Sequence, residues 1–471
     1  MQDHDSQELE IHRDDYSYEI GGGDFSGGAL ITSEEDNRTE DFGKKMPKLK
    51  LITFGCQANQ LDSERIAGLL SREGFQLTEW EEDADLILLN TCSIRQKAEE
   101  KFYSQLGRIG VLKNRNPSLK VGVCGCIAEQ EGERLRGRFP FVSLIVGSGQ
   151  IPKIPALLKG KEEQGAAPFT PLRFNKVKAW VEVMKGCNNF CTYCVVPYVR
   201  GREESRPPQD ILREIEDLIS DGYREVVLLG HNVNSYGRGL NSPLTFSQLL
   251  HRIEQRALGS IWIRFTTSHP RDFTTELARC FAELPSLCEH IHLPVQSGSD
   301  QVLTRMNRGY SRAHFLGIVD ELRSWVSDIA ITTDIMVGFP GETEEDFQAT
   351  LDLLERVRFD RIFSFKYSPR PQTKALSYGG HLPESLKESR LSQLNDLQDR
   401  ISLEKNRTML GKVVQVQVEK KGSKKDRKLL TARTRTNHIV HFADSKAEEG
   451  SLMRVRIEQA FAFHLKGEVI H

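Results

Sequence analysis

Short apolar runs alternate with amphipathic helical stretches along most of this chain, and this rhythm restricts the possible folds more than any other feature. In the first part, the runs LKLITF, DLILLN, SLKVGV and VSLIV are separated by stretches with helical periodicity at 60–72, 95–113 and 128–136. Strands that alternate with helices pair in parallel, because each helix carries the chain back across the sheet. We therefore predict an α/β domain with a doubly wound parallel sheet over residues 47–160.

The same rhythm continues over a longer span after a charged linker rich in Gly, Ala and Pro at 159–171. The candidate strands are 178–184, 225–229, 261–266, 289–293, 329–335 and 360–367, and the helices between them are 208–221, 244–256, 274–283, 312–326 and 343–357. About six β/α units suit a partial or complete β/α barrel better than a small doubly wound sheet. This second domain is predicted to cover residues 172–408, including a charged helix at 383–408.

The two ends of the chain differ from the middle. Residues 1–46 lack periodicity and are predicted to be a disordered acidic tail; positions 1–43 carry 13 acidic and two basic side chains. Residues 409–471 contain several short alternating strands, which predict a small antiparallel β-barrel. A basic body with an acidic tail points to a polyanionic partner, although the tail could serve only to keep the chain soluble.

The sequence shows no sign of a membrane protein or of a secreted one. No stretch of about 18 apolar residues occurs, and the beginning, MQDHDSQELE, has neither a basic region nor an apolar core. We predict a cytoplasmic protein, with monomer as the default state. The cytoplasm keeps thiols reduced, so the nine cysteines suggest metal binding or catalysis where they cluster. Cys280 and Cys288 have no neighbours of this kind and are predicted to be apolar filler.

The strongest chemical signal is a group of three cysteines, Cys187, Cys191 and Cys194, in the segment KGCNNFCTYC after a predicted strand. Three thiolates at these offsets on one loop can bind three irons of a 4Fe–4S cubane and leave the fourth iron open for an external ligand. A structural zinc site would need a fourth ligand nearby, and the next histidine is His231. The cluster is therefore favoured over zinc and over inert thiols.

A second set of cysteines follows three strands of the N-terminal sheet. Cys56, Cys92 and Cys126 take equivalent places after these strands, separated by 36 and 34 residues. Loops at the carboxyl edge of one parallel sheet converge, so the three thiols could hold a second cluster. Cys124 aligns with positions inside the other strands, Phe54 and Asn90, which makes Cys126 the better ligand. Buried cysteines acting as small apolar side chains are the alternative.

The CxxxCxxC spacing, with Tyr193 before the last cysteine, resembles the radical S-adenosylmethionine superfamily. A longer series of motifs over residues 48–471 resembles the methylthiotransferase family, and specifically its MiaB branch, with Ala58 and His231 as departures from the usual Met and Gln. In chain order the motifs are GCQANQLDSE, NTCSIRQKAEEK, GCIAEQ, MKGCNNFCTYCVVPYVRGREESRP, LGHNVNSYG, TTSHP, HLPVQSGSDQVLTRMNRGYSR, TTDIMVGFPGETEEDF and FSFKYSPRPQTKA.

This resemblance implies a transferase with two 4Fe–4S clusters and S-adenosylmethionine as cofactors. Its expected reaction converts N⁶-isopentenyladenosine at tRNA position 37 to the 2-methylthio derivative. One S-adenosylmethionine would methylate a sulfur on the auxiliary cluster, and a second would give a 5′-deoxyadenosyl radical at the cluster of Cys187, Cys191 and Cys194. Carbon 2 of adenine is neither acidic nor electrophilic enough for acid–base or nucleophilic routes. The expected reaction therefore needs a radical.

Related branches methylthiolate threonylcarbamoyladenosine in tRNA or an aspartate of a ribosomal protein, and these remain the alternative substrates. The tripeptides Gln57-Ala58-Asn59 and Ser93-Ile94-Arg95 differ from what those branches usually carry after the first and second cysteines. They favour the isopentenyladenosine branch.

The resemblance also implies binding residues. Contacts with S-adenosylmethionine are expected at Tyr193, Gly230, Asn232, Gln296, Ser297, Asp334, Met336 and Gly338. His269 fits the site and an ordinary loop equally well. Besides the tRNA anticodon stem-loop, the implied partners are a reductant such as flavodoxin or ferredoxin and a protein that supplies sulfur or Fe–S clusters.

For RNA, the C-terminal barrel resembles a TRAM domain, an OB-like module, and residues 411–435 carry nine basic against two acidic side chains. A charged run can also be a simple solvated face. The arginines after the cysteine loop could clamp phosphates or pair with Glu203, Glu204 and the following helix. The RNA contacts are expected at Arg200, Arg202, Arg206, Lys420, Lys421, Lys424, Lys425 and Arg427.

Overall fold

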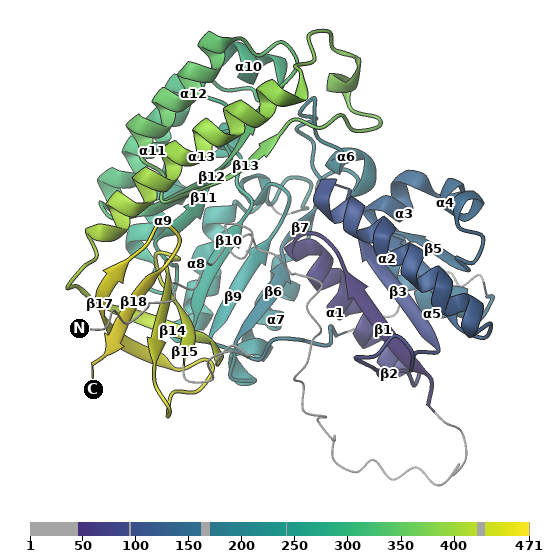
Figure 1. Cartoon of the computed structure of the whole chain (residues 1–471). Coiled ribbons are helices and arrows are strands. Elements are labelled where there is room, and N and C mark those ends of the chain that lie inside the picture. Colours follow the sequence, from purple (N-terminus) through teal and green to yellow (C-terminus); the bar gives the residue numbers. More distant parts are fainter. Residues whose placement is uncertain (1–45, 94–95, 162–169, 242, 422–428, 471) are drawn as a thin grey trace, which may run out of the picture.

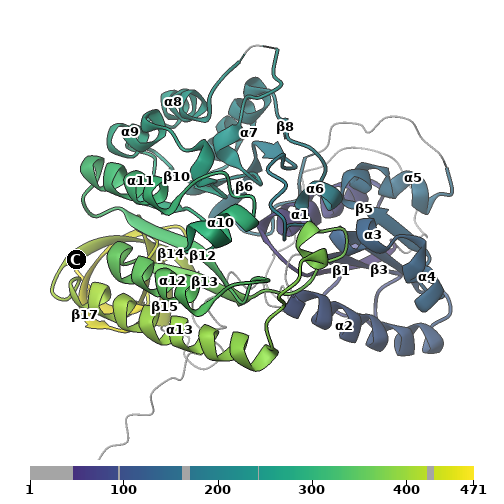
Figure 2. The same cartoon turned by 90° about the horizontal axis from the view of Figure 1, so that it is seen from above.

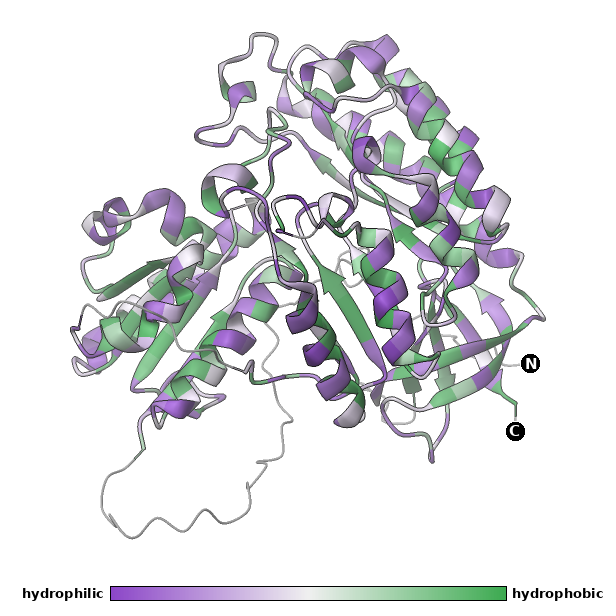
Figure 3. Ribbon diagram, turned by 180° about the vertical axis from the view of Figure 1, so that it is seen from behind, coloured by the Kyte–Doolittle hydropathy of each residue, from purple (hydrophilic) through white to green (hydrophobic). Residues whose placement is uncertain are grey.

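The computed structural model describes residues 46–93, 96–161, 170–241, 243–421 and 429–470, which form three units arranged in chain order (Figure 1). Positions 1–45 of the acidic tail and the basic residues within 422–428 lie outside these ranges. The strands are coloured mostly as hydrophobic, and the helices around them combine hydrophobic and hydrophilic residues (Figure 3). Among the described helices, none combines the length and apolar character needed to cross a membrane.

The N-terminal unit is a parallel five-stranded sheet in the order β2-β1-β3-β4-β5. Its strands are β1 (Lys48–Thr53), β2 (Gln76–Leu77), β3 (Leu86–Thr91), β4 (Lys120–Gly125) and β5 (Leu144–Gly147). Helices α1 (Gln57–Arg72) and α5 (Ile154–Leu158) build one apolar core on this sheet, and α2 (Gln96–Arg115) and α3 (Cys126–Glu131) build the other. Helices on both faces make it the predicted doubly wound fold. The helix expected at 128–136 is two short ones, because Gly132 (φ 52°) separates α3 from α4 (Glu133–Arg138).

The central unit contains six parallel strands in two sheets of three, ordered β10-β9-β6 and β11-β12-β13. A parallel bridge between Ile263 and Leu287 joins the two sheets into one arc. The strands are β6 (Lys178–Glu182), β9 (Glu225–Leu229), β10 (Trp262–Thr266), β11 (His290–His292), β12 (Ala330–Val337) and β13 (Arg361–Lys366). Because β6 and β13 are edge strands that do not pair with each other, the barrel is partial.

Amphipathic helices cover the outside of this arc (Figure 2). They are α7 (Pro208–Ser220), α8 (Phe246–Ala257), α9 (Thr275–Glu283), α11 (Arg312–Trp325), α12 (Glu344–Val357) and α13 (Glu384–Arg407). Their apolar faces and the outward side chains of the strands form the largest core of the protein. The predicted strands and helices of this unit are confirmed within a few residues; the short helices α6 (Val196–Val199) and α10 (Asp300–Arg305) were not anticipated.

The C-terminal unit is a closed barrel in the order β14-β15-β16-β18-β17. Its strands are β14 (Val413–Lys421), β15 (Leu429–Thr434), β16 (Ile439–Ala443), β17 (Leu452–Ala460) and β18 (Leu465–Val469). Four of the five pairings are antiparallel, but β16 and β18 run parallel, which corrects the expectation of a fully antiparallel barrel. A closed ring with an odd number of strands cannot alternate direction throughout, so one pair must be parallel.

The small barrel docks on the partial barrel through buried polar contacts. The guanidinium of Arg264 in β10 donates to the carbonyl oxygens of Thr434 and Arg435, at 2.7 Å each. Lys178, the first residue of β6, pairs with Glu419 of β14 at 2.8 Å. Arg435 pairs with Glu289, directly before β11. These contacts lie mostly near the amino ends of the strands, so the docked barrel leaves the carboxyl ends accessible (Figure 1).

We expect Arg264→Met to loosen this docking and destabilise the protein by about 3–5 kcal/mol. The side chains of Arg264 and Glu225 are 5% and 0% exposed, and removing the cation takes one partner from a buried carboxylate. Calorimetry of the cluster-free protein would measure the loss. The control is Arg256→Met, which breaks an exposed pair with Glu216 and should cost at most about 1 kcal/mol. Equal effects of the two substitutions would contradict the docking role of Arg264.

Candidate active site between two cysteine sets

A cavity of about 960 Å³ opens between the N-terminal sheet and the partial barrel. One wall comes from the loops that follow β1 and β3 and from the start of α2; the other comes from the carboxyl ends of the barrel strands, strand β13 and one side of α13. Active sites of β/α barrels and of doubly wound sheets form at these ends of the strands. The cavity wall includes five of the six cysteines predicted to bind clusters: Cys56, Cys92, Cys187, Cys191 and Cys194.

The loop with Cys187, Cys191 and Cys194 is held beside a buried arginine. Arg308 donates from Nη1 to the sulfur of Cys191 at 3.3 Å, and from Nη2 to the carbonyl of Pro294 at 2.6 Å. Burial raises the pKa of Cys187 to about 11 and that of Cys194 to about 12. Metal ligation needs thiolates, so cluster assembly here must displace protons. The nearby guanidinium favours the anionic product.

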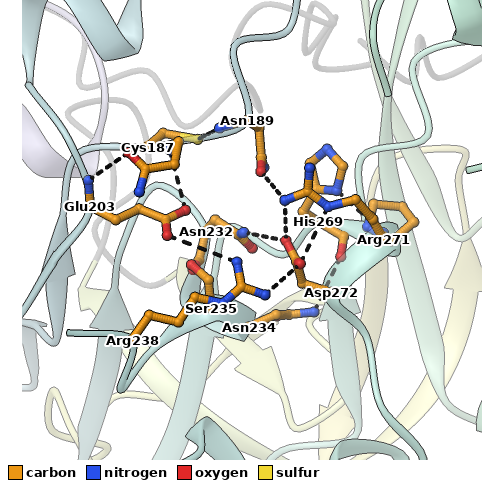
Figure 4. A network of polar contacts seen from close by, with 12 residues as sticks. Cys187, Asn189, Glu203, Asn232, Asn234, Ser235, Arg238, His269, Arg271 and Asp272 are labelled. Atoms are coloured by element: carbon orange, nitrogen blue, oxygen red, sulfur yellow. Dashed lines mark hydrogen bonds and ion pairs between the residues drawn. The ribbon is translucent and has the colours of Figure 1, made fainter. Parts of the chain in front are cut away.

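A polar network anchors the first part of this loop to two neighbouring turns of the barrel (Figure 4). Asp272 is its centre and accepts hydrogen bonds from Asn232 (2.7 Å), Arg238 (2.9 Å) and Arg271 (3.0 Å). Burial works against the ionised carboxylate, but these hydrogen bonds outweigh it and lower the pKa of Asp272. Arg271 also donates to the side-chain oxygen of Asn189, two residues after Cys187. The network therefore holds the cysteine loop against the ends of β9 and β10.

The other cysteines approach one another across the carboxyl edge of the N-terminal sheet. Cys56 precedes α1, Cys92 follows β3, and Cys126 begins α3. Gly55 has a φ of 119°, and a Cβ at that position would lie 2.2 Å from the Cβ of Cys92, so the first two loops are in contact. The thiol of Cys126 is close enough to Cys56 for their charges to interact.

The strand register agrees in part with the sequence alignment of these cysteines. Asn90 lies opposite Cys124, as aligned, but Thr53 rather than Phe54 lies opposite Asn90. The first loop is thus one residue longer, and Gly55 absorbs the difference with its positive φ. Cys124 itself packs in the apolar core under α1, and burial raises its pKa strongly. That environment suits a small apolar side chain.

Cys126 is fully buried and, among the described residues, is not part of the cavity wall. Its sulfur instead accepts a hydrogen bond from Nε of Arg200 at 3.3 Å. No three His, Cys, Asp or Glu side chains within the described ranges converge on a point that suits a single metal ion. A 4Fe–4S cubane does not require that convergence, because each thiolate binds a different iron.

Five of the predicted S-adenosylmethionine contacts line the cavity: Tyr193, Gly230, Gln296, Asp334 and Met336. His269 also lines it, and burial lowers the pKa of His269 well below its usual value, so the ring is neutral. In the described part of the chain, several buried polar atoms around the cavity have no hydrogen-bond partner. They are Oε1 of Gln296, Oδ1 of Asn232, Nδ1 of His231, Oγ of Ser268 and Nε2 of His269. Such atoms fit a polar ligand with charged groups at this place.

Two further predicted contacts, Ser297 and Gly338, have hydrogen-bonding or packing roles in the structure, and their contact with the cofactor stays a prediction. Ser297 lies next to Gln296, and its hydroxyl accepts from the amide of Ser299 and pairs with Thr350 of α12. Gly338 has a φ of 73°, and a Cβ there would lie 2.2 Å from a side-chain carbon of Lys387. Gly338 is thus needed for close packing of α13. Asn232 stays near the cavity through the network of Asp272.

The expected RNA contacts divide into three groups. Arg202 is exposed and stacks on Phe190, and Lys420 is exposed. Arg200 and Arg206 are corrected: Arg200 pairs with Asp62, and Arg206 pairs with Glu214 of the following helix, so neither presents a free guanidinium to phosphate. Lys424, Lys425 and Arg427 lie outside the described residues, as does the side chain of Lys421.

The sequence did not single out Arg308 or Asp62, although both contact key groups of the site. Arg308 belongs to the motif MNRGYSR, but the motif does not say which side chain turns toward the cysteine loop. Asp62 occupies one turn of α1 among other charged residues. Asp62 lies on the buried face of α1 and is 3% exposed. An acidic residue on the buried face of a helix was the signal that could have identified it.

Comparison with known proteins divides the chain in the same way. Residues 48–147 match the family described as "Uncharacterized protein family UPF0004", and residues 181–354 match the radical SAM superfamily. A solved structure of similar fold is the radical S-adenosylmethionine methyltransferase TsrM from Kitasatospora setae, with cobalamin and a [4Fe-4S] cluster bound. Its TM-score is 0.54 at 16% identity, and the match covers 70% of this chain and 77% of that one.

Curated relatives match nearly the whole chain. A tRNA-2-methylthio-N(6)-dimethylallyladenosine synthase of Moorella thermoacetica is 46% identical over 442 residues, covering 91% of this chain and 99% of the relative. The protein of the same name from Syntrophobacter fumaroxidans is 48% identical, covering 90% of this chain and 95% of the relative.

Substituting the two neighbouring cysteines one at a time tests the assignment of the N-terminal ligands. Because Cys124 packs in the core and Cys126 is close to Cys56, Cys124→Ala should retain about eight irons after anaerobic reconstitution, and Cys126→Ala about four. Iron and sulfide analysis with absorption spectroscopy would measure this. The reverse pattern would show that Cys124 is the ligand.

Proposed function

Because the chain belongs to the family of tRNA-2-methylthio-N(6)-dimethylallyladenosine synthases, we propose that the cavity between its two cysteine sets is the active site of that reaction. The enzyme is a radical S-adenosylmethionine methylthiotransferase, and its substrate is tRNA carrying N⁶-isopentenyladenosine. We assign that base to position 37, beside the anticodon.

The observation that carries the proposal is that cysteines of both sets face one cavity. When bound, the cluster at Cys187, Cys191 and Cys194 with S-adenosylmethionine supplies a carbon radical, and the cluster at Cys56, Cys92 and Cys126 carries the sulfur to be transferred. Methylthiolation of carbon 2 of adenine requires the radical and the sulfur to be at one place. A base that enters this cavity meets both cysteine sets without leaving the site.

The residues around the cavity can hold S-adenosylmethionine in one orientation. The unpaired oxygens of Gln296 and Asn232 are acceptors suited to the amino group of the methionine part. Arg308, held by Pro294 and Tyr310, offers a fixed positive charge beside Cys191, where the carboxylate of the ligand would be drawn. Tyr193 supplies an aromatic wall of the cavity for the adenine.

The neutral histidines of the wall add polar contacts without further charge. Burial, together with a smaller effect of Arg200, lowers the pKa of His231 to about 4, so its ring is neutral at physiological pH. Its unpaired Nδ1 is free, within the described residues, to bond a polar ligand or a water. A neutral wall avoids repelling the positively charged sulfonium of S-adenosylmethionine.

RNA recognition is proposed for the exposed basic side chains. Arg202 stacks on Phe190 at 4.3 Å beside the cysteine loop, which suits it for a phosphate near the target base. We propose that the C-terminal barrel is a TRAM domain whose basic segment 420–427 holds the tRNA by charge. Base 37 lies in a single-stranded loop, so turning it into the cavity costs little unstacking energy.

We further propose a cytoplasmic enzyme that receives electrons from a small reductant such as flavodoxin or ferredoxin. A sulfur-supplying or Fe–S assembly protein would restore the auxiliary cluster after each turnover, because transferred sulfur leaves with the product.

The experiment that tests the function is an anaerobic assay of the reconstituted enzyme with dithionite, S-adenosylmethionine and an isopentenylated anticodon stem-loop. Mass spectrometry of the nucleosides should show 2-methylthio-isopentenyladenosine together with 5′-deoxyadenosine. Cys191→Ala should abolish both products and keep about four irons at the N-terminal site. Accumulation of 5′-deoxyadenosine in that variant would contradict the assignment of the radical cluster. Product only on threonylcarbamoylated RNA, or on a ribosomal protein, would contradict the proposed substrate.

Removing the basic loop should weaken tRNA binding without changing the chemistry at the clusters. For Lys424→Ala, Lys425→Ala and Arg427→Ala combined, the slope of log affinity against log salt concentration should fall by about two to three, because each phosphate contact releases counterions. Binding titrations at several salt concentrations would measure it. The control, Lys113→Ala, Lys153→Ala and Arg134→Ala combined, lies on the N-terminal unit; an equal loss of slope there would show that the barrel is not the binding surface.

A further inference from the structure

Arg200 reaches from the loop of one cysteine set to the other set. It is the sixth residue after Cys194 and follows α6, within the central unit. Its guanidinium nevertheless enters the N-terminal unit, where Nε donates to the sulfur of Cys126 at 3.3 Å and Nη1 pairs with Asp62 at 2.5 Å. Arg200 is therefore a direct connection between the two proposed cluster sites.

The surroundings of this contact are almost free of water. The side chains of Arg200 and Asp62 are 8% and 5% exposed, and Cys126 is fully buried. Nη2 of Arg200 is also buried and has no hydrogen-bond partner among the described residues. An arginine remains charged even when buried, and a charge in such surroundings acts strongly on its neighbours. Its pKa is raised by Asp62, Cys126 and Cys56 against the effect of burial.

Asp62 opposes the effect of this cation on Cys126 but does not outweigh it. Asp62 pairs with Nη1, on the part of the guanidinium that does not contact Cys126. Arg65 lies 3.8 Å from Asp62 but forms its shorter contact, 2.8 Å, with Glu182. The group that touches the sulfur is therefore the Nε–H of a positively charged side chain.

We propose that Arg200 is a positioning residue of the auxiliary site, which orients the Cys126 thiolate and raises the reduction potential of the cluster bound there. The inference rests on the proposed function, which places a 4Fe–4S cluster on Cys56, Cys92 and Cys126. Hydrogen bonds to ligand sulfurs and local charge are two of the properties that set the potential of such clusters. A cation beside the sulfur stabilises the reduced cluster, which carries one more negative charge.

The same segment provides a matched comparison. Arg206 pairs within the central unit, with Glu214 at 2.8 Å and with the carbonyl of Glu182 at 2.6 Å, and among the described residues it contacts no sulfur. The contact with Cys126 distinguishes Arg200.

The test uses the full chain with Cys187→Ala, Cys191→Ala and Cys194→Ala, so that only the auxiliary cluster forms. Its reduction is followed by electron paramagnetic resonance during an anaerobic redox titration. In this background, Arg200→Gln should lower the ratio of reduced to oxidised cluster at least tenfold at a given potential, a shift of about 59 mV for one electron. Arg200→Lys keeps the charge and should stay within about threefold, and Arg206→Gln should leave the potential unchanged.

The other outcomes separate the role of Arg200 from the existence of the auxiliary cluster site. A cluster that forms with an unchanged potential in Arg200→Gln overturns the proposal, as do equal shifts in Arg200→Gln and Arg200→Lys. A background protein that binds no iron overturns the auxiliary site itself. If Arg200→Gln does not fold, Arg200→Gln with Asp62→Asn removes the unpaired buried carboxylate. That variant must also show a lowered potential, because Arg200 contacts the sulfur directly and acts on Cys126 more strongly than Asp62 does.

Discussion

The position of the active site depends on a chain of buried ion pairs that crosses from the N-terminal unit to the partial barrel. Helix α1 contributes Asp62, Glu64 and Arg65, and each pairs with a side chain of the central unit. Burying charges is costly, and such pairs are maintained only with good geometry, so they favour one relative placement of the two units. The three pairs are Asp62 with Arg200 (2.5 Å), Glu64 with Arg173 (2.9 Å) and Arg65 with Glu182 (2.8 Å).

This placement has a chemical consequence because both units are built from parallel strands. In each unit the carboxyl ends of the strands carry the cysteines, and the ion pairs hold those ends toward one cavity. The C-terminal barrel docks mostly near the amino ends, where Arg264 and Lys178 receive it. The barrel proposed to bind RNA is therefore docked away from the ends of the strands that carry the cysteines.

Much of the fold could be predicted from the sequence, since local periodicity reports directly on strands and helices. The six strands of the partial barrel are an example. Predictions that needed the direction of a side chain were less successful. Ser297 follows Gln296 in one motif, yet only Gln296 lines the cavity; the backbone turns at Gln296, whose φ is 76°, and the Ser297 hydroxyl bonds Ser299 and Thr350 instead. Gly338 has a conformational and packing role that a motif cannot distinguish from ligand binding.

The sequence by itself determined the chemistry of this protein: the two cysteine sets, the parallel α/β units that carry them and the family to which the motifs belong. These properties depend on residue types and short spacings, which the chain shows directly. Only the tertiary structure decided which side chains serve the two sites. Arg200 has the sequence context of a surface arginine, but it bonds Asp62 and Cys126, more than 70 positions away in the chain. Contacts of that range arise from the docking of two units, and local sequence carries no record of the partner that each buried charge will meet.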